Sequence, residues 1–340
     1  MSVGLVYDPV YLGHDTGEHP ENEQRLEAIV SRLKESGLWE KLVHIAPRQA
    51  TMEELLRVHS ERHILSVRQM AQAGGGQIDA DTVGSRHSFK AALYAAGGVE
   101  SALEAVMSGK ATSVFCLVRP PGHHATREQA MGFCLFNNVA VGAAHALDKY
   151  DLERVLILDF DVHHGNGTQD IFRNEPRVCY ISVHQSPLYP GSGGVEERGA
   201  GNMFNIPLPP GCVDDEYERI YDEIVIPLGR RFSPQLVLVS AGFDAHWADS
   251  LASMCLSITG YAGITRRIKA LADECCGGKV VFSLEGGYNP AAPAGNVKAV
   301  LDVLLGNEKI EDKLGACPSG EKRPDITSLL ARLKEVFELS

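Results

Sequence analysis

Short apolar runs alternate with longer segments of helical periodicity along most of the chain. Six runs are predicted to be strands, at residues 4–7, 113–118, 155–159, 178–183, 236–240 and 279–284. Apolar residues recur at helical spacing between or after them, at 22–36, 86–108, 137–149, 214–231, 259–275 and 291–305. Strands that are apolar on both faces belong in a sheet covered by helices on both sides. The alternation therefore predicts an α/β fold with a central parallel sheet.

One domain is expected over residues 1–340, because no repeat or low-complexity tract divides the chain. Its core is predicted to span about 1–305, followed by a C-terminal extension, 306–340, whose last helix starts near Asp325. Three glycines at 74–76 lack the Lys-Ser or Lys-Thr of a phosphate-binding loop, so we expect them to end a helix.

Charge and cysteine content restrict the partners and the compartment. The net charge of −12 has the wrong sign for holding nucleic acid. The first residues lack a basic region and a long apolar run, and no segment approaches the roughly 18 apolar residues of a membrane helix. The eight cysteines include no Cys-x-x-Cys pair, which favours a cytoplasmic protein with reduced thiols and no disulfide framework.

Acidic residues and a histidine gather at the ends of two predicted strands. Asp159, Asp161 and His163 lie at alternate positions, so they project to one side, and Asp244 follows a later strand. The carboxyl ends of parallel strands meet at one edge of a sheet. Asp161, His163 and Asp244 therefore form a three-ligand set with an open position, as at a catalytic zinc site. Such acids can also cap helices or pair with arginine, but buried charge without a partner is costly, which favours the metal.

Two further strand ends carry groups suited to acid–base chemistry. His123 and His124 lie in the proline-stiffened loop RPPGHHA, residues 119–125, which holds both imidazoles in one direction. Tyr288 follows two glycines after another strand and can donate to a developing oxyanion. A histidine pair or a tyrosine alone is a weak signal, since both also occur as structural residues. Their position at the same sheet edge favours the catalytic interpretation.

These segments together resemble the histone deacetylase and acetylpolyamine amidohydrolase superfamily. The matching segments, in family order, are RPPGHHA (119–125), GFCLFNN (132–138), DFDVHHGNG (159–167), SAGFD (240–244) and EGGY (285–288). The opening HDTG and HPE, residues 14–17 and 19–21, followed by Arg25-Leu26, is similar to the class II branch and its bacterial relatives. The resemblance implies the arginase–deacetylase fold, with about eight strands, and hydrolysis of an N-acetyl amide, most often on a lysine-like amine.

The resemblance also implies a role for each matching position. The implied zinc ligands are Asp161, His163 and Asp244. The implied catalytic residues are His124 as base, His123 as its partner, Asp159 behind His123, Asn166 behind His124, and Tyr288 on the acetyl carbonyl. A structural potassium is implied at Asp159, Asp161, His163, Ser182 and Val183. The implied substrate channel comprises Gly132, Phe133, Tyr189, Leu251 and Gly287. Other branches have an acid at the position of Asn166, so the base here is expected to be weaker. An oxygen-rich shell also accepts Fe(II), Co(II) or Mn(II).

The sequence leaves several alternatives open. In related polyamine deacetylases a glutamate aligns with Leu251, so leucine favours acetyl-lysine-like substrates, although Asp79 or Asp81 can supply charge at the rim. A two-metal ureohydrolase needs an acid two positions after Asp244, where His246 stands. A non-catalytic acetyl-ligand binder would have lost the base or the phenol. The physiological substrate, the acyl length and the formation of a homo-oligomer are not determined by the sequence.

Overall fold

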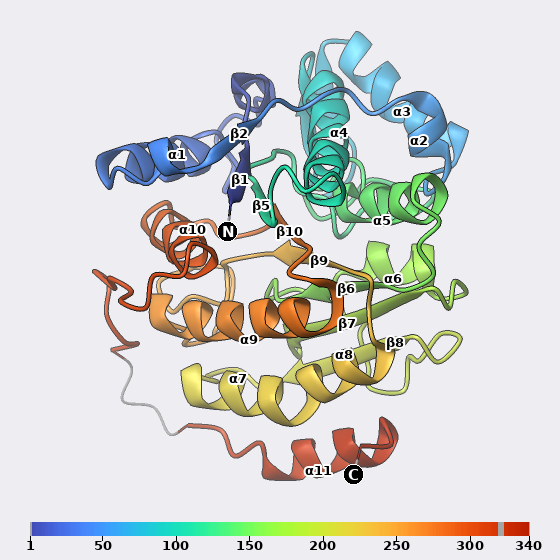
Figure 1. The fold of residues 1–340 in the computed structure, drawn as a ribbon. Coiled ribbons are helices and arrows are strands. Elements are labelled where there is room, and N and C mark those ends of the chain that lie inside the picture. The colour runs from blue at the N-terminus through green and yellow to red at the C-terminus, as the bar shows by residue number, and fades with distance from the viewer. Residues whose placement is uncertain (1, 319–322, 340) are drawn as a thin grey trace.

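A single eight-stranded parallel sheet forms the centre of the molecule (Figure 1). A computed structural model describes residues 2–318 and 323–339. The strand order is β2-β1-β5-β10-β9-β6-β7-β8. The strands are β1 (Val3–Val6), β2 (Val43–Ile45), β5 (Ser113–Cys116), β6 (Val155–Asp159), β7 (Val178–Gln185), β8 (Met203–Leu208), β9 (Leu236–Ala241) and β10 (Val280–Leu284). Residues of β1, β5, β6, β7, β9 and β10 are buried throughout, as expected for strands covered on both faces.

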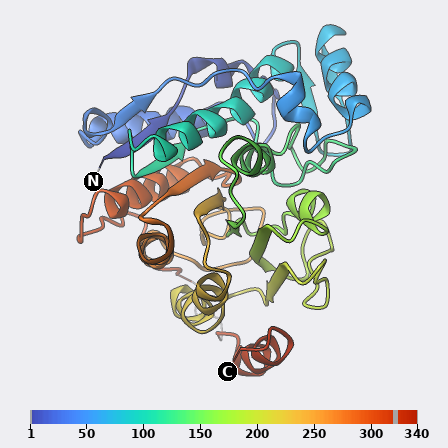
Figure 2. The same ribbon diagram turned by 45° about the vertical axis from the view of Figure 1, so that its right-hand side comes forward.

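Helices cover both faces of this sheet (Figures 1 and 2). One layer contains α2 (Met52–Leu56), α3 (Glu61–Gln72), α4 (Ser88–Met107), α5 (Asn138–Lys149) and α6 (Asn166–Phe172). The other contains α1 (Gln24–Glu35), α7 (Asp214–Ile220), the π-helical turn η3 (Tyr221–Val225), α8 (Ile226–Phe232), α9 (Ile258–Cys276) and α10 (Ala291–Leu304). The 3₁₀ turn η1 (Pro9–Gly13) follows β1, and a second 3₁₀ turn, η2 (Trp39–Lys41), directly precedes β2. The predicted α/β class, with a parallel sheet and helices on both faces, is confirmed.

The strands and helices that the sequence pattern missed are mostly short or polar. Both edge strands were missed, because β2 has only three residues and β8 contains Asn205 and Pro207, which break its apolar run. The helices α2, α3 and α6 and the antiparallel hairpin of β3 (Gly75–Gln77) and β4 (Val83–Ser85) were also missed. The prediction that residues 74–76 only end a helix is wrong in part, since two of the three glycines belong to β3.

The helix predicted over 214–231 is interrupted by the π-helical turn η3. Pro227 lies just after this turn and has no backbone N–H, so the regular α-helical ladder cannot continue through it.

The C-terminal extension follows α10 and is described over residues 306–318 and 323–339. It ends in α11 (Thr327–Val336), which buries Leu330 and Leu333 and packs against η3 at the bottom of Figure 1. The helix starts two residues after the predicted Asp325. In the described part of the chain, no helix combines the length and apolar character needed to cross a membrane.

Candidate active site

The carboxyl ends of β6 and β9 bring together the residues predicted as metal ligands. Nδ1 of His163 lies 3.1 Å from Oδ1 of Asp161 and 3.1 Å from Oδ2 of Asp244. The candidate ligand atoms of the three residues all lie within 4.8 Å of one another. Gly286, just after β10, donates its N–H to Oδ2 of Asp161 at 2.8 Å. A Cβ at Gly286 would lie 2.2 Å from Oδ2 of Asp244, so only glycine allows the backbone to approach this closely.

The charges at this site favour a bound cation. Asp161 and Asp244 are almost completely buried. Burial and repulsion by Asp161 raise the pKa of the Asp244 carboxyl. Burial alone would lower the pKa of His163, but its hydrogen bonds with the two carboxylates raise it to about 10. Two carboxylates and an imidazole therefore converge on a point that attracts positive charge, and this donor set suits a divalent metal ion.

A second group of potential ligands, Glu54, Glu100 and His145, lies in the helical layer of α4 and α5. Arg48 occupies it, with Nη2 2.7 Å from Glu54 and Nη1 3.1 Å from Glu100. A guanidinium already compensates these carboxylates, so this group is an ion-pair network rather than a metal site.

The two neighbouring histidines at the site have different partners and different proton affinities. Nδ1 of His123 donates to Oδ2 of Asp159 at 3.1 Å, and Nδ1 of His124 donates to Oδ1 of Asn166 at 2.7 Å. Burial would lower the pKa of His123, but Asp161 and Asp159 raise it to about 10. Burial and the nearby positive charges on His123 and His163 lower the pKa of His124 well below its usual range. His123 is thus suited to carry a proton and His124 to accept one.

Glu285 anchors the loop that carries both histidines, a role that the sequence interpretation did not assign. Its buried carboxylate accepts hydrogen bonds from the backbone N–H of Gly122 at 2.6 Å and of His123 at 3.1 Å. The hydroxyl of Ser240 donates to it at 3.1 Å. Burial raises the pKa of Glu285 to about 7. An acid directly after an apolar strand is a sequence signal for such a role, because a buried carboxylate needs several donors.

Tyr288 is held by contacts with its ring and its backbone, and burial keeps its phenol protonated. The Arg25 guanidinium lies 4.9 Å from the centre of the tyrosine ring, and the Phe133 ring lies 5.6 Å away, edge to face. The backbone N–H of Tyr288 donates to Oδ2 of Asp249 at 2.6 Å. Burial raises the pKa of the phenol well above 10. The phenol can therefore donate a hydrogen bond. Asp249 has no sequence signal, since it lies in a polar loop that meets Tyr288 only in the folded chain.

A cavity of about 210 Å³ leads to this cluster, and four of the five residues predicted for the substrate channel line it. Its lining is Asp81, His124, Gly132, Phe133, His163, Leu188, Tyr189, Leu251 and Tyr288. The sequence interpretation did not single out Leu188. Phe133 has a left-handed φ of 68°, and Gly132 lies so close to the His124 ring that a Cβ would overlap it.

Of the other residues predicted for the channel and its rim, Asp81 lines the cavity, and Asp79 and Gly287 do not. Asp81 contributes to the lining of the cavity, whereas Asp79 is exposed on the same hairpin loop and does not line it. Gly287 is not part of the lining either; its carbonyl accepts a hydrogen bond from Nε of Arg25 at 2.5 Å.

The implied potassium site shares Asp161 and His163 with the predicted metal ligands, and its other three residues lie in β6 and β7. The register of β6 and β7 pairs Asp159 with Ser182, and Val183 is the next residue in β7. Asp159 and Ser182 are buried. The Asp159 carboxylate accepts hydrogen bonds from Tyr180 Oη at 2.8 Å and from the N–H of Asp161 at 3.1 Å.

Comparison with known proteins gives consistent matches over the whole fold. A family model described as "Histone deacetylase domain" matches residues 19–304. A "Probable deacetylase" of Archaeoglobus fulgidus is 43% identical over 296 residues, covering 85% of this chain and 82% of that protein. A "Histone deacetylase-like amidohydrolase" of Pseudomonas aeruginosa is 39% identical over 308 residues, covering 89% and 80%. The crystal structure of an HDA15 HD domain superimposes with a TM-score of 0.87 at 34% identity, covering 99% of this chain and 94% of that one.

Proposed function

The chain belongs to the histone deacetylase family, and from this premise we propose that it is a zinc-dependent deacetylase of acetyl-lysine-like amines. One observation carries the proposal: two carboxylates and an imidazole converge beside a histidine pair at a narrow channel. A channel of this kind admits a flexible aliphatic chain and presents polar groups to the amide at its end.

The metal would be held by Asp161, His163 and Asp244, the donor set described above. When bound, zinc supplies a Lewis acid that polarises the acetyl carbonyl and acidifies water. Two aspartates balance the charge of a divalent ion, so proton removal requires a separate base. The same donor set accepts Fe(II) or Co(II). A potassium ion behind it would use main-chain oxygens together with the side chains of Asp159 and Ser182.

The chain's own residues then move the protons. Oδ1 of Asn166 accepts the hydrogen on Nδ1 of His124, which leaves Nε2 with a lone pair to take a proton from the attacking water. Tyr288 donates a hydrogen bond to the acetyl oxygen as negative charge develops there. His123, with its raised pKa, supplies a proton to the departing amine as the C–N bond breaks. Asp159 orients His123 and stabilises its protonated form.

The reaction class is tested by assaying the metal-loaded chain on a generic fluorogenic acetyl-lysine peptide. We expect turnover that a chelator abolishes and added zinc restores, because all three ligand side chains come from the chain itself. Urea release from guanidino substrates, assayed in parallel with manganese, would instead indicate a ureohydrolase. Metal binding without turnover of any acetyl amide in a panel of peptides, acetylpolyamines and small metabolites would indicate a binding protein.

The residues at the channel mouth favour a lysine-like substrate over an acetylpolyamine. Leu251 lines the channel and offers an internal ammonium no charge partner. Asp81 is the acid that lines it, and its Oδ1 accepts a hydrogen bond from Oγ1 of Thr82 at 2.9 Å. That hydroxyl in turn accepts one from the N–H of Phe133 at 3.1 Å, so Asp81 is tied to the channel wall. The proposed role of Asp81 is to bind the substrate backbone at the rim.

A substitution at Leu251 tests this preference. We expect wild-type kcat/KM to be higher for acetyl-lysine peptides than for acetylspermidine. Leu251→Glu should shift the ratio toward acetylspermidine by roughly 2- to 5-fold, the scale of one partly exposed ion pair. Leu251→Gln is the matched control, since glutamine has the shape of glutamate without its charge. Competition kinetics measure the ratios, and a wild-type preference for acetylspermidine would contradict the assignment of Leu251.

A further inference from the structure

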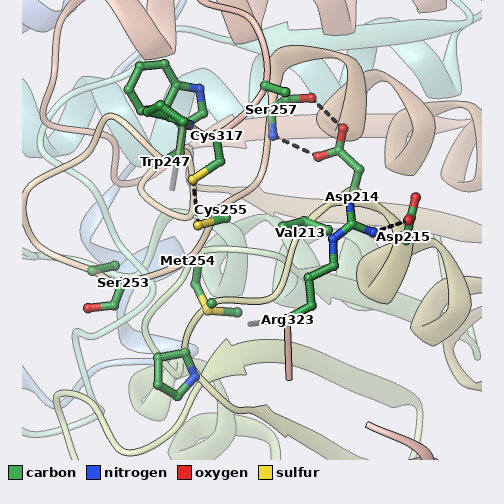
Figure 3. A pocket seen from close by; sticks show the side chains of 15 residues that line it. Val213, Asp214, Asp215, Trp247, Ser253, Met254, Cys255, Ser257, Cys317 and Arg323 are labelled. Carbon is green, nitrogen blue, oxygen red and sulfur yellow. Dashed lines mark hydrogen bonds and ion pairs between the residues drawn. The ribbon is translucent and has the colours of Figure 1, made fainter. Parts of the chain in front are cut away.

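A second cavity, of about 600 Å³, lies beside the C-terminal extension and outside the channel (Figure 3). Two cysteines line it. Cys255 belongs to the loop between β9 and α9, and Cys317 belongs to the extension, 62 residues further along the chain. Figure 3 shows the two side chains pointing toward each other from these separate segments.

The two sulfur atoms are in direct contact. Sγ of Cys317 lies 2.7 Å from Sγ of Cys255, so the side chains already point at each other, as a disulfide requires. Both residues are half-buried at the wall of the open cavity, which gives a small oxidant access. The cysteines that are instead buried are Cys116, Cys134, Cys179, Cys212 and Cys276.

Neighbouring hydrogen bonds hold both cysteines in place. Nε1 of Trp247 donates to the carbonyl of Gly315 at 2.9 Å, which docks the extension two residues before Cys317. The N–H of Cys255 donates to the carbonyl of Cys212 at 2.9 Å. The thiols are thus brought together by backbone and side-chain contacts on both segments.

We propose that Cys255 and Cys317 are a redox modification site that forms a reversible disulfide, fastening the C-terminal extension to the loop after β9. A low-molecular-weight disulfide is the oxidant. The thiolate of one cysteine attacks it, forming a mixed disulfide and releasing one thiolate. The thiolate of the second cysteine then attacks the sulfur of the first cysteine in the mixed disulfide and releases the second small thiolate. Two cysteine thiols are oxidised, one disulfide is reduced to two thiols, and the cysteine protons pass to the released thiolates. Reversible disulfides of this kind occur in reducing compartments.

The position of the pair also links it to the channel. Leu251, four residues before Cys255, lines the channel, and Ala252 to Cys255 line the second cavity. The N–H of Ser253 donates to Oε1 of Gln185 at 2.8 Å, and Asp249 accepts the N–H of Tyr288. The disulfide would therefore fix a loop that contributes to the channel wall.

Peptide mapping of the full chain tests the proposal. The protein is equilibrated with excess glutathione disulfide, remaining thiols are alkylated, and trypsin is added. Residues 232–266 and 314–322 are tryptic peptides with one cysteine each. We expect the two peptides to be joined after oxidation and to separate with dithiothreitol. The Tm of the intact oxidised protein should rise by roughly 3–6 °C, because the disulfide closes a long loop.

Two variants make the result specific. Cys317→Ser should lose the linked peptide and the rise in Tm and carry a glutathione adduct on Cys255. Cys275→Ser is the matched control, because it removes another half-buried cysteine and should retain both effects. Alkylation of both cysteines in the treated wild type would overturn the proposal. Linkage of Cys255 to a cysteine other than Cys317 would do the same.

Discussion

We expect the Asp244→Asn variant to remain folded, to lose metal binding and to lose deacetylation to the background level. Asparagine keeps the shape of the side chain and an oxygen that can accept the N–H of Val162, now 2.9 Å from Oδ1. The substitution removes one of two carboxylates that repel each other. The Tm of the metal-free variant should therefore be no lower than the Tm of the metal-free wild type. Without the second carboxylate, the remaining ligands bind a divalent ion weakly.

Thermal melting with and without zinc separates a ligand from a structural residue. An ion at about 1,000 times its Kd stabilises a one-site protein by about 4 kcal/mol, so wild-type Tm should rise on zinc addition. We expect no such rise for Asp244→Asn. Asp273→Asn is the control, because Asp273 lies on the surface of α9 and should keep both the zinc-induced rise and the activity. Normal metal content and turnover in Asp244→Asn would show that the ligand assignment is wrong.

The sequence predicted the centre of the sheet better than its edges for a physical reason. Central strands such as β6 and β9 are buried on both faces, so their sequences are continuous apolar runs. An edge strand has fewer constraints, and β8 accommodates Pro207 because one side of it needs no hydrogen-bonded neighbour. Edge strands therefore carry a weaker sequence signal.

The same reasoning explains which parts of the site could be predicted. Asp161, His163 and Asp244 follow strands that a parallel sheet brings to one edge, so local sequence and topology suffice to group them. Asp249 and Leu188 lie in loops whose paths depend on long-range packing. Asp249 meets Tyr288 across 39 residues of chain, and no local pattern encodes that contact.

The arrangement around Tyr288 separates the role of its hydroxyl from that of its ring. Arg25 and Phe133 contact the ring, and Asp249 holds the backbone N–H, so phenylalanine can keep each of these contacts. The hydroxyl remains protonated because burial raises its pKa well above 10. Removal of the Tyr288 hydroxyl should therefore slow the chemical step far more than it affects folding or metal binding.

We expect Tyr288→Phe to lower kcat by roughly 10²-fold or more, the usual cost of removing one oxyanion donor, with metal content and Tm near wild type. KM should change little, because the hydrogen bond strengthens only as charge develops on the acetyl oxygen. Tyr189→Phe is the matched control: Tyr189 lines the same channel but is 37% exposed, and loss of its hydroxyl should leave kcat within a few-fold of wild type. Steady-state kinetics on an acetyl-lysine peptide distinguish the two. Equal losses in both variants would assign the effect to channel packing, and wild-type turnover in Tyr288→Phe would exclude its phenol from the mechanism.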